Sequence, residues 1–130
     1  MPYQKYNNQA CCYFNLNQFE NALKLLSSSE MTEAIANTTS SSVKQLENEF
    51  NRGLVLKNLQ HHGQALQCFD RCFKMHREAM LAKGASGISW LPRLHLERVD
   101  LLLHSGHFAQ AVTEISDVLS TFEAPSPAPS

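Results

Sequence analysis

Apolar residues recur along this chain at intervals of three and four, and short polar turns interrupt them. This spacing predicts amphipathic α-helices, because residues three and four apart share one helix face. No segment shows the strict alternation of apolar and polar residues that is typical of a strand. We therefore expect an all-α protein of about six helices, at about Tyr3–Leu16, Phe19–Ser28, Val43–Leu59, Gly63–Leu81, Leu91–His104 and Phe108–Phe122.

Breaks in the pattern set the expected limits of these helices. Residues 38–42 have low helix propensity, and Ser42, with Gln45 three residues on, is the expected N-cap of the third helix. The pattern leaves open whether residues 30–37 continue the second helix or form a short helix of their own. Residues 124–130 contain only Pro, Ser and Ala, so we expect a helical domain at 1–123 followed by a tail or linker.

One short pattern occurs three times, at residues 14–23, 59–66 and 103–112. Each copy has an apolar helical run, a polar turn, and a second run with an early Ala. A repeated helical hairpin predicts a stacked array, because one hairpin cannot bury its apolar face alone. The helices are thus expected to pair in three hairpins, at about 3–28, 43–81 and 91–122.

The residues around the three turns resemble the tetratricopeptide repeat family, whose unit is a helix-turn-helix of about 34 residues. In that family, small residues allow the two helices to approach, and bulky residues fill the groove beside them. The matching positions are Ala10, Tyr13, Asn17, Phe19, Ala22, Leu26 and Ser29 in the first copy, Gly53, Leu56, Gln60, His62, Ala65, Phe69 and Cys72 in the second, and Val99, Leu102, Gly106, Phe108, Ala111, Ile115 and Val118 in the third.

The resemblance implies a right-handed stack of three hairpins, with a longer repeat than is usual in the family. The early alanines of the second helices lie 43 residues apart (Ala22 to Ala65) and then 46 (Ala65 to Ala111). Because both spacings exceed about 34, we expect extended helices or inserted loops at Ser27–Ser42 and Met80–Ser89.

Composition narrows the possible functions. The chain is 43% apolar and 18% charged, which is typical of a globular protein, and its net charge of -1 gives no electrostatic reason to expect nucleic-acid binding. No apolar stretch is long enough to span a membrane or to act as a signal peptide. The spacings of the four cysteines are poor for disulfides, so we expect reduced thiols in a cytoplasmic protein. These cysteines are Cys11, Cys12, Cys68 and Cys72.

Metal binding and catalysis find little support. Cys68, Cys72 and His76 share one helix face, but three ligands over two turns span about 12 Å, too far for one ion. Two of them with His61 or His62 would remain a possible site, although Cys72 is better explained as a small packing residue. Glycine-rich phosphate loops, His-Glu-x-x-His and Gly-x-Ser-x-Gly are absent from the sequence. We therefore expect no metal, no cofactor and no enzyme activity.

The resemblance also implies where a partner would bind. Exposed side chains on the first helix of each hairpin would line a concave wall that takes an extended or helical peptide. The expected wall residues are Gln4, Asn7, Asn8, Cys11 and Phe14, then Glu47, Phe50, Asn51, Leu54 and Lys57, then Arg93, Leu96, Glu97, Asp100 and Leu103. The expected anchors are Asn8, Phe50, Asn51, Leu54 and Arg93. The family's clamp for acidic C-terminal peptides requires a cation where this chain has Glu97, which would repel a carboxylate.

The sequence therefore predicts a non-catalytic interaction module or scaffold segment, within a larger protein or complex. Its expected partner is a protein or peptide, or neighbouring repeats of a longer array. Two alternatives are a helical sensor domain, whose small ligand or peptide controls an attached effector domain, and a dedicated chaperone that holds a partner protein.

Overall fold

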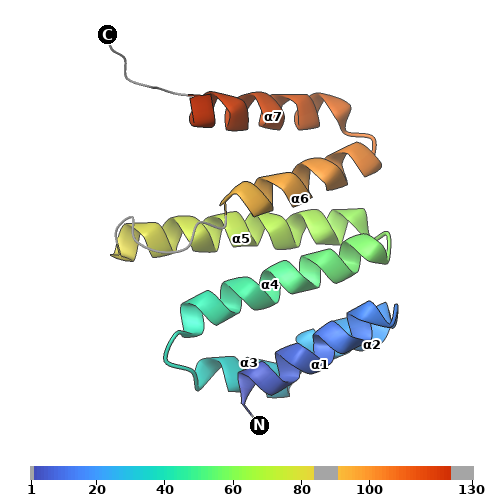
Figure 1. Ribbon diagram of the computed structural model, residues 1–130, viewed down its shortest axis with the longest axis vertical. Helices are drawn as coiled ribbons and strands as arrows, with labels where there is room; N and C mark the ends of the chain where they lie inside the picture. Colours follow the sequence, from blue (N-terminus) through green and yellow to red (C-terminus); the bar gives the residue numbers. More distant parts are fainter. Residues whose placement is uncertain (1, 84–90, 124–130) are drawn as a thin grey trace.

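The computed structural model describes the backbone of residues 2–83 and 91–123 and the side chains of residues 2–79 and 92–120. Within these ranges the chain forms helices and no strand, which confirms the all-α prediction. The helices stack one above another, with α1 at one end and α7 at the other (Figure 1). They are α1 Tyr3–Asn15, α2 Phe19–Leu26, α3 Ser29–Ala36, α4 Ser41–Asn58, α5 His62–Lys83, α6 Leu91–His104 and α7 Phe108–Glu123.

The described ranges contain seven helices rather than about six, because α3 is separate from α2. Ser28 has an extended backbone (φ −75°, ψ 155°), which ends the preceding helix. Its hydroxyl accepts a hydrogen bond from the Met31 backbone N–H at 3.1 Å and so caps α3. The buried side chains of Met31, Ala34 and Ile35 then hold α3 against the stack. This helix accounts for the long first repeat, as expected from an insertion between residues 27 and 42.

The predicted cap of the third helix was wrong by two residues. α4 begins at Ser41 after Ser40, and no side chain caps its first turn. The expected extension at 80–89 is in part a helix, since α5 continues to Lys83. Residues 84–90 and the predicted tail at 124–130 lie outside the described residues.

Each hairpin turn has the same geometry. Asn17, Gln60 and Gly106 have left-handed backbones, with φ of 61°, 67° and 84°. The residue after each donates its backbone N–H to the carbonyl five residues back, at 2.8, 2.9 and 2.8 Å. The left-handed residue itself donates to the carbonyl three back, at 3.0, 3.0 and 3.3 Å. These paired bonds are a Schellman motif, which satisfies the last carbonyls of the first helix. All three turns lie on the same edge of the stack (Figure 1).

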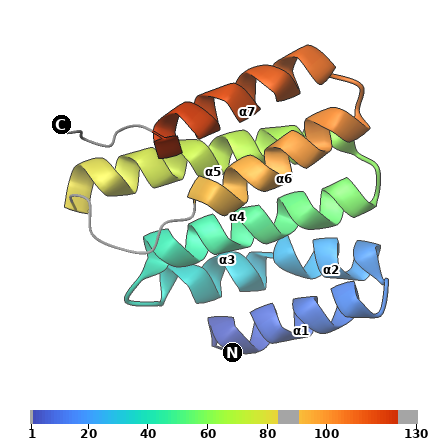
Figure 2. The same ribbon diagram turned by 45° about the horizontal axis from the view of Figure 1, so that its top comes forward.

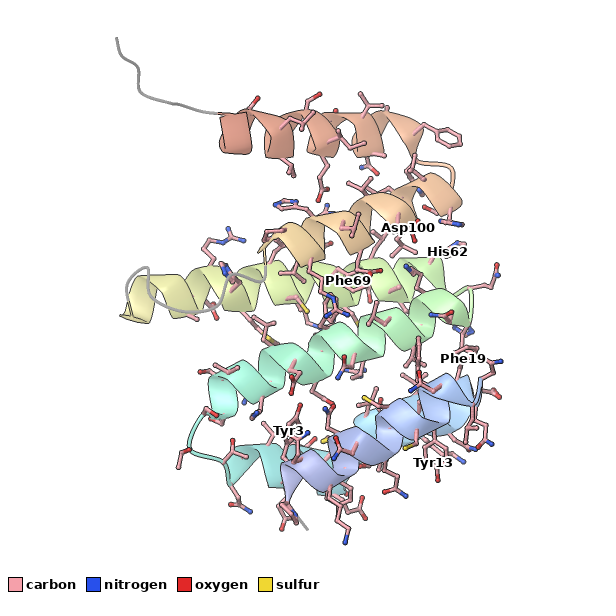
Figure 3. The ribbon with its side chains drawn as sticks, in the orientation of Figure 1. Tyr3, Tyr13, Phe19, His62, Phe69 and Asp100 are labelled. Carbon is pink, nitrogen blue, oxygen red and sulfur yellow. The ribbon has the colours of Figure 1, made fainter. Side chains whose placement is uncertain are left out.

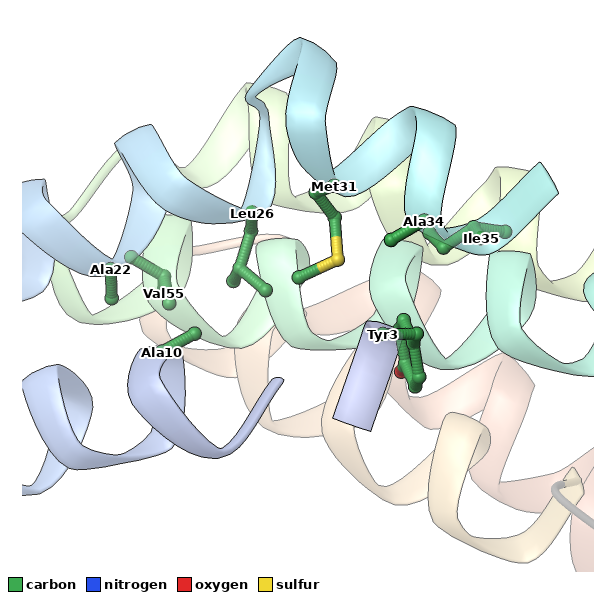
Figure 4. Packing of buried hydrophobic residues seen from close by; sticks show 8 residues of the cluster. All are labelled: Tyr3, Ala10, Ala22, Leu26, Met31, Ala34, Ile35 and Val55. Atoms are coloured by element: carbon green, nitrogen blue, oxygen red, sulfur yellow. The ribbon is translucent and has the colours of Figure 1, made fainter. Parts of the chain in front are cut away.

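Among the described residues, two clusters of buried side chains each join successive hairpins. In the first cluster, Val55 of α4 packs with buried residues of α1, α2 and α3 (Figure 4). In the second cluster, Leu94 and Leu101 of α6 pack with buried residues of α4 and α5. The members of the first cluster are Tyr3, Ala10, Ala22, Leu26, Met31, Ala34, Ile35 and Val55; those of the second are Phe50, Leu56, Ala65, Cys68, Phe69, Cys72, Leu94 and Leu101.

The small residues that the repeat pattern singles out lie at helix contacts. Ala22, Ala65 and Ala111 are fully buried. Gly53 faces Phe69, which lies where α5 packs on α4 (Figure 3), and a Cβ atom added to Gly53 would lie 2.7 Å from the Phe69 ring. Close approach of the paired helices therefore depends on these positions, as the sequence predicted.

Candidate partner-binding groove

The first helices of the three hairpins, α1, α4 and α6, are joined by polar side chains. Asn51 Nδ2 on α4 donates to Asn7 Oδ1 on α1 at 3.0 Å, and the Tyr3 hydroxyl of α1 donates to Glu47 Oε1 of α4. Lys57 Nζ on α4 donates to Glu97 Oε1 and Asp100 Oδ2 on α6, at 2.7 and 2.8 Å. The three helices therefore form one continuous wall, although the chain connects none of them directly.

A pocket of about 240 Å³ opens in this wall. Its lining is mainly apolar, with amide groups, a thiol and one guanidinium at the polar positions. The lining residues come from four helices: Ala10, Cys11, Phe14 and Asn15 of α1, Leu26 of α2, Asn51, Leu54 and Val55 of α4, and Arg93 of α6. A pocket of this composition can hold an apolar side chain while its amides bond to polar groups beside it.

The structure brings together three of the five expected anchors. Asn51, Leu54 and Arg93 line the pocket. Asn8 is exposed but lies outside the lining, and its Oδ1 accepts from Gln4 Nε2 at 3.0 Å. The expectation that Phe50 is an exposed anchor was wrong, because its side chain is only 1% exposed.

Phe50 is buried because its helix face points toward the next hairpin rather than into the pocket. Its ring packs on Phe69, with 5.7 Å between the ring centroids, and it belongs to one cluster with Leu94 of α6. The Arg93 guanidinium lies 4.9 Å above the Phe50 ring, a cation–π distance. Phe50 thus contacts the Arg93 guanidinium through its ring face and is not positioned to contact a partner.

Sequence reasoning missed some of the pocket lining. Asn15 and Val55 were not among the expected wall residues, while Cys11 and Phe14 were in the wider set without being chosen as anchors. Asn7 was expected to be exposed but is only 9% exposed. One signal could have corrected both errors of burial: Asn7 and Phe50 each lie ten residues before the left-handed residue of their turn.

Charge at the wall is partly neutralised. Burial lowers the pKa of Lys57, but the hydrogen bonds that it donates to Asp100 and Glu97, and the negative charges of these carboxylates, outweigh this effect, so the pKa is raised and the lysine stays charged. Glu97, which argued against binding of a carboxylate, is itself paired with this lysine. Burial, and then the neighbouring Cys12 and Glu47, raise the pKa of the Cys11 thiol, which keeps it neutral in the pocket. Arg93 is exposed and supplies positive charge at the rim.

A second hollow, of about 590 Å³, lies between α5, α6 and α7. There His95 Nδ1 lies 2.8 Å from Glu114 Oε2, and Arg98 lies 3.2 Å from Glu114 and 2.7 Å from Asp70. The hydroxyl of Thr113 in this lining donates to the Ala109 carbonyl. These groups bond to each other across three helices, which is typical of a structural network.

Three of the candidate metal ligands, Cys68, Cys72 and His76, are buried. Cys68 and Cys72 are buried in the second cluster, and His76 is 9% exposed. Within the described side chains, no three His, Cys, Asp or Glu residues lie close enough together to hold one ion. Burial raises the pKa of both thiols, that of Cys68 to about 11. All four cysteines are free, and Cys11 and Cys12 are exposed.

None of the described helices combines the length and the apolar character that crossing a membrane requires.

Comparison with known proteins places this geometry in a family. The sequence model of the tetratricopeptide repeat matches residues 4–28 and 50–78, which cover α1–α2 and most of α4–α5. No curated protein and no solved structure matches the chain significantly. The repeats of this family generally mediate protein–protein interactions and are not catalytic. The helical stack, the repeated turns and the matched segments agree, and the first two hairpins of the chain are tetratricopeptide repeats.

Proposed function

We propose that the chain is an interaction module that binds a partner peptide or helix in the groove between α1, α4 and α6. The observation that supports this most is the pocket to which four helices contribute, with Leu54 at its apolar part and Asn51 and Arg93 at its polar part. An apolar partner side chain would enter the pocket, and Asn51 and Arg93 would bond to the partner backbone or to an acidic neighbour.

The size of the pocket favours a peptide over a small ligand. Its volume of about 240 Å³ lies below the range of roughly 300–1,000 Å³ that is usual for small-molecule sites. One side chain of a peptide needs less room, and the rest of the peptide can lie along the wall. We therefore favour the interaction module, in a scaffold or complex subunit, over the sensor domain. The reduced thiols suit a cytoplasmic protein.

The test begins with affinity purification of the tagged chain and mass spectrometry of what it retains. The affinity of the retained partner is then measured for Leu54→Ala and Arg93→Ala, with thermal melts alongside. Central contacts carry most of the binding energy, so each variant should lose about 1–3 kcal/mol, roughly 5- to 150-fold in affinity. The matched control is Asn8→Ala, on the same wall but outside the pocket lining, which should bind like the wild type.

Unchanged affinity in both Leu54→Ala and Arg93→Ala would place the interaction on another surface. A loss of binding together with a large fall in melting temperature would show that the side chains act through stability rather than contact.

A further inference from the structure

The hollow of about 590 Å³ between α5, α6 and α7 shares no lining residue with the pocket in the groove. Its two walls belong to the second helices α5 and α7, whereas the first helices form the groove. A volume of this size lies within the range of roughly 300–1,000 Å³ that is usual for small-molecule sites. The hollow is therefore a separate candidate site for a small ligand.

An extension of α5 forms one wall of the hollow. Counted from the left-handed turn residue, α2 ends at the ninth residue and α5 at the twenty-third. The yellow end of α5 projects beyond α4 and α6 (Figure 1). Phe73 and Arg77, which line the hollow from α5, lie 13 and 17 residues after the turn residue, where the first hairpin has the separate helix α3. This wall is thus a property of this chain and not of the repeat in general.

Ion pairs across three helices hold the base of the hollow. The Glu114 carboxylate of α7 lies 2.8 Å from His95 Nδ1 and 3.2 Å from Arg98 Nε, both on α6. Arg98 also pairs with Asp70 of α5, at 2.7 Å. The His95 ring and the Arg98 guanidinium pack on the Phe73 ring, at 4.8 and 5.6 Å from its centroid. Because these groups satisfy one another, the base of the hollow is preformed and its charges are paired.

Among the described lining residues, Arg77 on the α5 wall is the charged group that remains for a ligand. Its side chain is exposed and forms no ion pair with a described carboxylate. Asp117 stands on the opposite wall, on α7, and is not free. A guanidinium binds a carboxylate through two parallel hydrogen bonds, so a carboxylate is the complementary ligand group.

The apolar part of the lining suits the body of such a ligand. Leu102 of α6 is 2% exposed, and Phe73 and Ala109 complete the apolar surface. The Gln110 amide of α7 is exposed in the same lining, where it can bond to a polar group of a ligand. Apolar contact together with one charged anchor fixes both the position and the orientation of a small molecule.

We propose that the hollow between α5, α6 and α7 binds a small organic carboxylate with an aromatic or aliphatic body. The carboxylate pairs with the Arg77 guanidinium, and the body packs on Phe73, Leu102 and Ala109. A protein partner in the groove and a small molecule in this hollow would occupy different surfaces of the stack.

The probe for this proposal is para-fluorophenylacetate, and its binding to the whole chain is followed by fluorine NMR. It should bind with a dissociation constant of about 1 mM or lower. The neutral para-fluorophenylacetamide, which has a similar shape, should bind about tenfold more weakly, and Arg77→Gln should weaken binding of the acid by a similar factor. The matched control is Lys74→Gln, because Lys74 is an exposed cation on α5 outside the lining; this variant should bind like the wild type.

Two variants at Ala109 locate the probe independently of Arg77. Ala109→Glu places a carboxylate in the hollow, whereas Ala109→Gln adds a side chain of nearly the same size without the charge. The glutamine variant should bind the acid about tenfold more tightly than the glutamate variant, because like charges repel. Ala109 is exposed, so both variants should melt close to the wild type. Arg93→Gln tests the guanidinium of the groove, and the probe should bind this variant as it binds the wild type.

Four results would overturn the proposal. The first is no binding of the acid up to about 10 mM, and the second is equal binding of the acid and the amide. The third is wild-type affinity in Arg77→Gln, or an equal loss in Lys74→Gln, which would show a general attraction of charge. The fourth is loss of binding in Arg93→Gln, which would place the probe in the groove. The function proposed for the groove does not depend on these outcomes, since the two sites share no lining residue.

Discussion

Replacing Gly53 by alanine should reveal how tightly α4 and α5 pack. The new Cβ atom would lie 2.7, 3.0 and 3.1 Å from three carbon atoms of the Phe69 ring. Ordinary contact begins at 3.4 Å, so the ring or the helix must move by about 0.7 Å. Phe69 is 0% exposed and packs on Phe50, so the ring has no free space to enter.

Two effects of opposite sign decide the outcome. Alanine in a helix interior is favoured over glycine by about 1 kcal/mol, whereas overpacking a core costs about 1–3 kcal/mol. Because the ring is fully enclosed, we expect overpacking to prevail and Gly53→Ala to lower the free energy of unfolding by up to about 2 kcal/mol. The melting temperature should fall by up to roughly 8 °C, at about 4 °C per kcal/mol.

The assay is urea unfolding followed by circular dichroism at 222 nm, with Gly63→Ala as the matched control. A Cβ atom at Gly63, also helical, would meet nothing within 4 Å, so this variant should be as stable as the wild type or more stable, by up to about 1 kcal/mol. If Gly53→Ala were stabilised like the control, α4 and α5 would be farther apart than the structure has them.

Three further predictions concern turns, thiols and charge. Gln60→Gly should raise the free energy of unfolding by about 1 kcal/mol and Gly106→Ala should lower it by a similar amount, because both positions have positive φ; equal urea midpoints would contradict the left-handed turns. Two of the four thiols should react with a thiol reagent in the native protein and the other two only after unfolding, since two are exposed and two buried; four fast reactions would show that α5 is loosely packed. The pKa of Lys57 is raised in the folded state, so its ion pairs stabilise the protein fully below the unfolded pKa of about 10.4 and lose that contribution as the pH rises through the folded value. Lys57→Met should therefore be less stable at neutral pH and should lose less stability above about pH 10, as followed by urea unfolding at each pH; parallel pH profiles would contradict the pairing.

Local signals in the sequence predicted much of the fold. Ala22, Ala65 and Ala111 are buried, and the turns fall at the expected residues, because both features depend on a few neighbouring positions repeated three times. The separation of α3 was left open because Ser27, Ser28 and Ser29 are all plausible caps, and only the extended backbone at Ser28 decides between them.

The groove was harder to predict than the fold. Whether a residue of a first helix faces the pocket or the next hairpin depends on how neighbouring hairpins rotate on each other. Phe50 was misassigned for this reason, whereas Leu54, one turn further along α4, does line the pocket. The partner and the compartment remain predictions.

The position of the turns has a practical consequence for engineering this stack. All three Schellman turns lie on one edge, and α3 with the connection to α4 lies away from it (Figures 1 and 2). The turn edge accepts no change of length, because one added residue would break the bonds that end each first helix. The opposite edge already carries a natural insertion of one helix between α2 and α4. A fluorescent reporter or a foreign epitope should therefore be grafted between Ala36 and Ser41, where it would leave the spacing of the hairpins unchanged.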